Sequence, residues 1–124
     1  RDVAPSRGLG DVYKRQYIFR LYRRESQRIE SKLSICLVSA VDSSKNELKD
    51  IKLLEKAMDK ISFSISNSLR MRDVYTRYSR SQYLLLLLDA DKSSFDGIEE
   101  RIMTRFRRSK TMNSVNVKFD FKEI

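Results

Sequence analysis

Two apolar runs dominate the hydrophobic pattern of this chain, LSICLVSAV at 33–41 and YLLLLL at 83–88. Both are much shorter than the about 20 residues that a membrane-spanning helix needs. Residues 74–78 alternate before the second run, and a polar turn at 79–82 separates the two segments. The pattern predicts a β-hairpin whose second strand is covered on both faces, at the centre of a sheet. The run at 33–41, ended by Asp42, predicts another buried strand.

In three other segments, apolar residues recur at helical spacing. From Glu47 to Met71, apolar residues recur in steps of three and four, which predicts one long helix. A second helix is expected over Ser94 to Arg108, with Ser93 or Ser94 as its N-cap. Residues 17–32 form an apolar stripe among several arginines, which predicts an amphipathic entry helix.

Residues 115–121 alternate between apolar and polar types, which predicts a final, half-exposed strand at a sheet edge. The expected order is therefore a helix followed by β-α-β-β-α-β. This order predicts an α+β fold of the ferredoxin-like, split βαβ type, with an antiparallel sheet and its helices on one face. Because 124 residues suit one domain, we assign 17–124 to a single domain.

The first sixteen residues differ in character from the rest. They hold the single proline and two of the three glycines, and they show no periodicity. They also resemble a translated sequencing adapter. We therefore expect 1–16 to be a non-native, unstructured segment, and the true N-terminal part of the protein to be missing.

Composition narrows the chemistry further. The chain has no histidine, which excludes histidine-based acid/base catalysis and histidine metal ligands. Its one cysteine, Cys36, lies in an apolar run and is expected to be a core residue in a reducing cytoplasm. No secretory signal or membrane span is visible, so a cytoplasmic location without membrane contact is expected.

The net charge of +9 raises the question of whether this chain binds nucleic acid. Basic residues concentrate at 20–28 and 101–110, and an RNA-binding module of ferredoxin-like fold is one alternative. Such a module needs exposed aromatic residues on its inner strands, where this chain offers only Tyr83. The charge runs are better interpreted as solvated helix faces, and direct nucleic-acid binding is not expected.

The hairpin resembles a known signature. Arg70-x-x-Asp73, then Arg77-Tyr78, then the five-residue turn SRSQY and a leucine-rich strand are similar to the hairpin of GGDEF domains, the bacterial diguanylate cyclases. The resemblance covers nearly everything after residue 16. It implies the same ferredoxin-like core, preceded by a helix that links the domain to an upstream module.

The family's catalytic groups are replaced here. The resemblance aligns Ala40, Ser81 and Gln82 with the carboxylates that hold Mg²⁺ in active cyclases. Leu48 stands where the family has a guanine-contacting asparagine, and Glu55 where it has an aspartate. Alanine, serine and glutamine side chains carry no charge near neutral pH, so no cage for a hard cation is expected.

The paired glycines of the family turn are also replaced, by Ser79 and Arg80. Their side chains would occupy the space through which the backbone approaches the nucleotide. The resemblance therefore implies a protein that is not an enzyme, with no catalytic residue, metal ligand or cofactor.

One family feature keeps its spacing. Arg70 and Asp73 stand where active cyclases carry the inhibitory site for cyclic di-GMP, and an arginine fork with a carboxylate suits that ligand. In the simpler interpretation, Arg70 interacts with the end of the preceding helix and Asp73 opens the strand with a turn bond.

The function expected from all this is a catalytically inactive, GGDEF-like regulatory or interaction domain of a larger bacterial signalling or transcription-regulatory protein. The segments YRRESQR and RDVYTRYSRSQYLLLLL are similar to degenerate GGDEF-like tails of SARP-type transcriptional activators. The expected partners are an upstream domain and a second copy. A cyclic di-GMP receptor acting through Arg70 and Asp73 is the main alternative.

Overall fold

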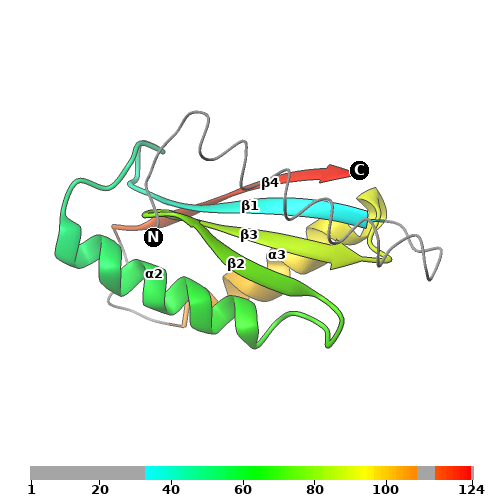
Figure 1. The fold of residues 1–124 in the computed structure, drawn as a ribbon. Helices are drawn as coiled ribbons and strands as arrows, with labels where there is room; N and C mark the ends of the chain where they lie inside the picture. Colours follow the sequence, from blue (N-terminus) through cyan, green and yellow to red (C-terminus); the bar gives the residue numbers. More distant parts are fainter. Residues whose placement is uncertain (1–32, 109–113, 124) are drawn as a thin grey trace.

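The computed structural model describes residues 33–108 and 114–123, and every structural statement below refers to them. The predicted segments at 1–16 and 17–32 lie outside the described residues. The elements follow the predicted order, with four strands and two helices (Figure 1). They are β1 (Leu33–Val41), α2 (Ile51–Ser66), β2 (Val74–Ser79), β3 (Gln82–Leu88), α3 (Lys92–Phe106) and β4 (Asn116–Glu123).

The strands form one antiparallel sheet in the order β2-β3-β1-β4. At its centre, Cys36 of β1 lies opposite Leu85 of β3 and opposite Phe121 of β4. The two apolar runs of the sequence are therefore the two inner strands. The predicted α+β fold with an antiparallel sheet is confirmed.

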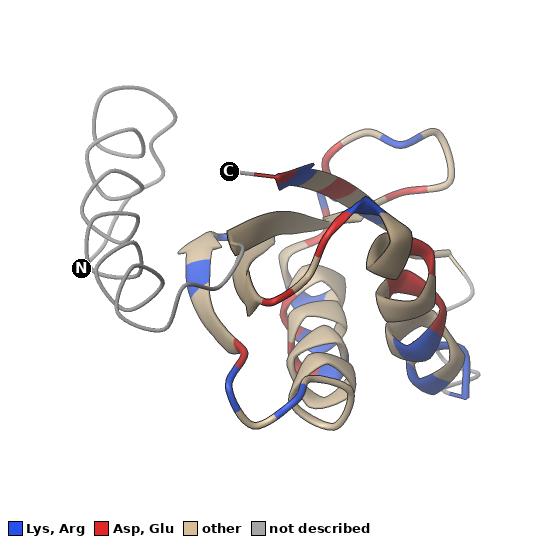
Figure 2. Ribbon diagram, turned by 90° about the vertical axis from the view of Figure 1, so that its right-hand side faces the viewer, with Lys and Arg blue, Asp and Glu red and all other residues tan. Residues whose placement is uncertain are grey.

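Both described helices pack on the same face of the sheet (Figures 1 and 2). Val38 and Leu85 point into this layer, where they meet Met58 and Ile61 of α2 and Ile102 of α3 in one buried cluster. The helical stripes predicted from steps of three and four supply this cluster. The helix layer is the main core of the domain.

The opposite face of the sheet is also apolar. Ile35, Tyr78, Leu84 and Leu86 form a second cluster of buried side chains there. Because neighbouring residues of a strand point to opposite faces, the leucine run of β3 supplies both clusters alternately. The prediction that this strand is covered on both faces is confirmed.

Helix α2 is shorter than the stretch from Glu47 to Met71 that the sequence predicted. Glu47 forms an isolated antiparallel bridge with Val41, so the chain is still extended there. Asp50 is the N-cap, and its carboxylate accepts from the backbone amides of Lys52 and Leu53.

The C-terminal end of α2 also comes earlier than predicted. Beyond Ser66, the carbonyl of Phe63 accepts from the side-chain amide of Asn67 and from the hydroxyl of Ser66. Short polar side chains that bond the backbone in this way compete with helix continuation. The serine-rich segment therefore ends the helix, although Leu69 continues the apolar stripe and packs against the core.

Helix α3 begins two residues before the predicted start. Its N-cap is Asp91, which accepts from the amide of Ser93, so the assignment of the cap to Ser93 or Ser94 was wrong. A carboxylate at this position interacts favourably with the helix dipole, which explains why it takes the cap from the serines.

Strand β4 lies at the edge of the described sheet, as its alternating sequence predicted. Phe121 packs between two other rings, with centroids 4.4 Å from Phe95 of α3 and 6.2 Å from Phe119. These contacts attach the beginning of α3 to the edge strand.

Cys36 is a free cysteine with a fully buried side chain, as expected for a core residue. Burial raises the pKa of its thiol far above the ordinary range, because the charged thiolate would lose its hydration. Neither described helix is long and apolar enough to span a membrane.

Candidate functional site

The structure brings together the three positions that the sequence aligned with the metal-binding carboxylates of cyclases. The backbone amide of Ala40, at the end of β1, donates to the carbonyl of Ser81 in the turn, at 2.9 Å. Ser39 lies directly opposite Gln82 in the register of β1 and β3. We call this region, formed by residues 39, 40, 79, 81 and 82, the hairpin end.

The side chains of the hairpin end are neutral, and those of Ser39, Ser79 and Gln82 are bonded to one another. The amide nitrogen of Gln82 donates to the hydroxyl of Ser39 at 3.0 Å, and its amide oxygen lies 2.8 Å from the hydroxyl of Ser79. The methyl group of Ala40 is buried in the core and adds no polar group. The hairpin end therefore presents a hydrogen-bonded network of neutral side chains where a cation site would need negative oxygens.

Arg77 fixes the backbone of the turn. Its Nε donates to the carbonyl of Ser79 and its Nη2 to the carbonyl of Arg80, both at 2.8 Å. The guanidinium carbon lies 5.5 Å from the ring centroid of Tyr83. Among the described residues only Lys45 and Asp89 have positive φ, so the turn keeps its shape without glycine.

The loop after β1 is built around Asp42, which serves as a turn residue. Its Oδ1 accepts from the amides of Ser44 at 2.8 Å and Asn46 at 2.9 Å. Further along, Leu48 is part of the helix-side core, whereas Glu55 is exposed on α2. The structure therefore gives Leu48 a packing role, whereas the carboxylate of Glu55 faces solvent.

Arg70 and Asp73 lie together at the other end of β3, as a closed pair. The guanidinium donates from Nε to Oδ2 at 3.0 Å and from Nη2 to Oδ1 at 3.1 Å. It also donates to the carbonyl of Leu88 at 2.6 Å, and the amide of Leu88 donates to Asp73. The carboxylate of Asp73 is only 2% exposed, whereas the Arg70 side chain is 48% exposed.

These bonds give the Arg70–Asp73 pair a clear structural role. Asp73 also accepts from the backbone amide of Arg70, and its own amide donates to the carbonyl of Arg70 at 3.0 Å. The pair therefore closes the connection after α2 and attaches it to the end of β3. The turn bond at Asp73 that the sequence suggested is present.

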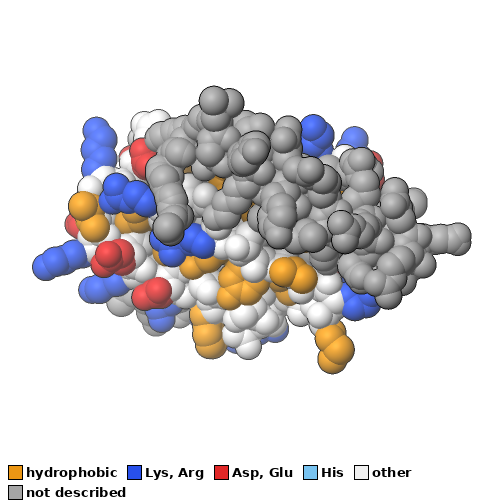
Figure 3. Space-filling model, in the orientation of Figure 1, with side chains coloured by type: hydrophobic (Ala, Val, Ile, Leu, Met, Phe, Trp, Pro, Cys, Tyr) orange, Lys and Arg blue, Asp and Glu red, His pale blue; other side chains and the backbone are white. Residues whose placement is uncertain are grey.

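The inner strands expose no aromatic surface. Tyr83, the one aromatic residue of β1 and β3, is buried, and its hydroxyl donates to the carbonyl of Met58. The large exposed hydrophobic side chains of the described residues are Ile51, Phe63, Met71 and Val74. On the face seen in Figure 3, hydrophobic side chains form separate spots rather than one continuous patch.

Sequence reasoning missed two features. The Arg77 contacts depend on the bulge between Arg77 and Ser79, which spacing alone does not reveal. A basic hollow between α2 and α3 also escaped notice, because its residues lie more than 40 positions apart along the chain. In the described residues, no three carboxylate or cysteine side chains gather closely enough to hold a metal ion.

The element order and the sheet topology match the fold of diguanylate cyclase domains of known structure. A DGC protein from Thermotoga maritima superposes with a TM-score of 0.66 at 21% identity, covering 87% of this chain and 78% of the other. Diguanylate cyclase SiaD of Pseudomonas aeruginosa, solved with its activator SiaC, gives 0.64 at 19%, covering 89% and 45%.

The isolated GGDEF domain of TpbB (YfiN) from Pseudomonas aeruginosa gives a TM-score of 0.52 at 18% identity, covering 82% of this chain and 64% of the other. No protein-family model and no curated protein matches the sequence. At these identities the similarity establishes the fold, and the chemistry has to be argued from this chain's own residues.

Proposed function

We propose that this chain is a catalytically inactive GGDEF-like domain that acts in regulation through contacts with other domains. The observation that carries the proposal is the hairpin end. Ala40, Ser81 and Gln82 meet there, and none of them carries a carboxylate.

The physical argument concerns charge. Joining nucleotides through two metal ions requires anionic ligands that hold Mg²⁺ against a triphosphate. A methyl group, a hydroxyl and a carboxamide supply no negative charge, and the hydroxyl of Ser39 and the amide of Gln82 already bond each other.

The direct test is turnover. The full chain is incubated with GTP and Mg²⁺, and the mixture is separated by liquid chromatography, with an active diguanylate cyclase as positive control. We expect no cyclic dinucleotide above the background of a protein-free sample. Product that scales with the concentration of this chain would overturn the proposal.

The proposed setting is a larger bacterial signalling or transcription-regulatory protein in the cytoplasm, with an upstream domain as the first partner. The SARP-type similarity of the sequence and the basic, amphipathic segment at 17–32 support this setting. SiaD, which shares the fold, was solved in complex with its activator protein, an example of a cyclase bound by a protein partner.

Self-association tests the role of the segment at 17–32. The test is light scattering on the full chain and on a chain that starts at Leu33. The full chain should show a mass larger than that of one copy, and the shortened chain should show the mass of a monomer. Circular dichroism checks that the shortened chain is still folded. A monomer in both cases, unaffected by an added upstream domain, would contradict the proposed interaction role.

A receptor for cyclic di-GMP is the second candidate, because Arg70 lies half-exposed beside Asp73. The ligand would have to replace the bonds between the guanidinium and the Asp73 carboxylate. Calorimetric titration with cyclic di-GMP decides the question. Binding that disappears in Arg70→Ala supports this candidate, and no heat of binding in the unaltered chain excludes it.

A further inference from the structure

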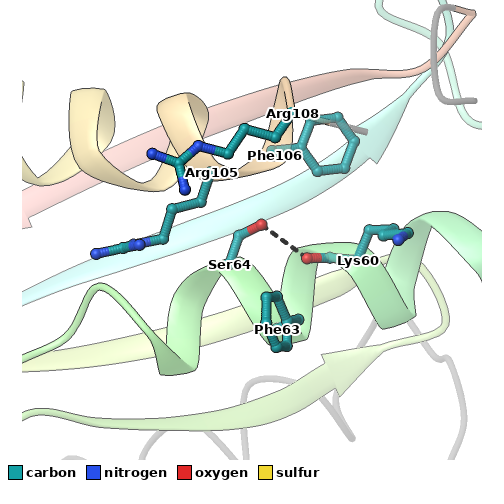
Figure 4. A pocket seen from close by; sticks show the side chains of 6 residues that line it. All are labelled: Lys60, Phe63, Ser64, Arg105, Phe106 and Arg108. Carbon is teal, nitrogen blue, oxygen red and sulfur yellow. Dashed lines mark hydrogen bonds between the residues drawn. The ribbon is translucent and has the colours of Figure 1, made fainter. Parts of the chain in front are cut away.

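A hollow of about 180 Å³ lies between α2 and the last turn of α3. Lys60, Phe63 and Ser64 line it from α2, and Arg105, Phe106 and Arg108 line it from the end of α3 (Figure 4). No residue of the hairpin end and neither member of the Arg70–Asp73 pair contributes to it. The hollow is therefore a feature separate from the sites discussed above.

The lining is cationic and contains no carboxylate. Lys60, Arg105 and Arg108 also have no acidic residue three or four positions away along the chain, where a helical ion pair would form. Figure 2 shows the same separation on α3, with acidic residues towards its beginning and basic residues towards its end. The three cations therefore leave a positive potential in the hollow.

Three carbonyls near the helix ends have partners other than these cations. The carbonyl of Met103 accepts from the amide of Arg107 at 2.8 Å, and that of Arg105 from the amide of Arg108 at 3.3 Å. On α2, the carbonyl of Phe63 is taken by the side chain of Asn67. Backbone and amide donors satisfy these three carbonyls, which basic side chains could otherwise cap.

One of the arginines is held in place by the helices themselves. Nε of Arg105 donates to the hydroxyl of Ser68 at 3.1 Å, and that hydroxyl donates to the carbonyl of Ser64 at 2.7 Å. This chain of bonds orients the guanidinium and leaves its terminal nitrogens available for an anion. A preoriented guanidinium loses less conformational entropy when it binds.

Two phenylalanines complete the hollow. Phe106 is buried, whereas Phe63 is 67% exposed. An exposed ring beside cationic groups suits a ligand that has both a planar ring and a phosphate, because the ring stacks and the phosphate accepts charge-assisted bonds. The volume is below the roughly 300 Å³ at which pockets for drug-sized ligands begin, which favours one phosphate with part of one base.

We propose that this hollow binds a mononucleotide, with the phosphate against Arg105 and Arg108, whose guanidinium groups lie on the same side in Figure 4, and the base against Phe63. Lys60 adds positive charge from the other side of the hollow. Such a site would make the domain responsive to a nucleotide without any chemistry at the hairpin end. It is also independent of whether the Arg70–Asp73 pair binds cyclic di-GMP.

Calorimetric titrations of the full chain with GMP, inorganic phosphate and guanosine test the site. GMP should bind, inorganic phosphate more weakly and guanosine not measurably. The double variant Lys60→Gln/Arg108→Gln should weaken GMP binding at least about tenfold, because it removes one charge-assisted contact and one further positive charge from the lining. Phe63→Leu should bring GMP down to the affinity of inorganic phosphate.

The matched control is Lys52→Gln/Lys118→Gln, which removes the same charge from exposed positions outside the hollow and should leave GMP binding unchanged. Arg70→Ala should also leave it unchanged. No heat with GMP, equal losses in the two double variants, or a loss caused by Arg70→Ala would each overturn the assignment. So would tight binding of single-stranded RNA that GMP does not displace.

Discussion

Asp73 shows how much one side chain contributes to this fold. Its carboxylate is almost completely buried, yet it accepts from the guanidinium and amide of Arg70 and from the amide of Leu88. A buried charge is tolerated only where donors of this kind surround it. The residue that first suggested a ligand site is thus also a structural residue that attaches the end of α2 to the central strand.

Replacing Asp73 by Asn should therefore destabilise the domain by about 2 kcal/mol, because the NH2 group of the new amide, itself a donor, would face the donors from which the carboxylate accepts. Urea unfolding followed by circular dichroism measures the change. Asp89→Asn is the matched control, since Asp89 pairs with Arg72 at a half-exposed position and should cost less than about 1 kcal/mol. Equal losses in the two variants would contradict the structural role of Asp73.

The boundaries of some helices and strands can be predicted from the local sequence, and those of others cannot. The bounds of β1 were predicted as they occur, because the apolar run that ends before Asp42 fits few structures other than a buried strand. The helix ends were not, since capping depends on which short polar side chain reaches a free backbone group. Asp50 and Asp91 took the caps, while the apolar stripes continue past both ends of α2.

The cap of α2 can be tested directly. Asp50→Ala should cost about 1 kcal/mol in unfolding free energy, because the amides of Lys52 and Leu53 lose their acceptor. Asp50→Ser should retain most of the stability, since a serine hydroxyl can cap the same amides. Denaturation in urea compares the three proteins, and a serine variant as unstable as the alanine variant would argue against capping.

The packing of β3 on both faces of the sheet can also be tested. Leu85 faces the helix layer and Leu84 the opposite cluster, and both are buried. Leu85→Ala and Leu84→Ala should each cost about 2–5 kcal/mol, as expected for cavities in a packed core. Thermal unfolding would show it, and a Leu84 variant as stable as the original chain would mean that the second face is not tightly packed.

For the whole molecule, the fold class could be predicted from the order of apolar runs and helical stripes, and the four-stranded sheet confirms it. The meeting of Ala40 with Ser81 could not be derived from spacing, because it depends on how β1 pairs with β3. Only the resemblance of the hairpin to a known family pointed to it. The hollow between α2 and α3 had no such signal, since its two sides come from separate helices.

The buried position of Cys36 gives the molecule an internal reporter of its own opening. The thiol lies in the core between the sheet and the helices, and its raised pKa keeps it protonated, so an alkylating reagent should modify it only after the domain opens. The labelling rate should then follow the unfolding equilibrium and rise with urea. Rapid modification of the native chain, as fast as that of the denatured chain, would contradict this expectation.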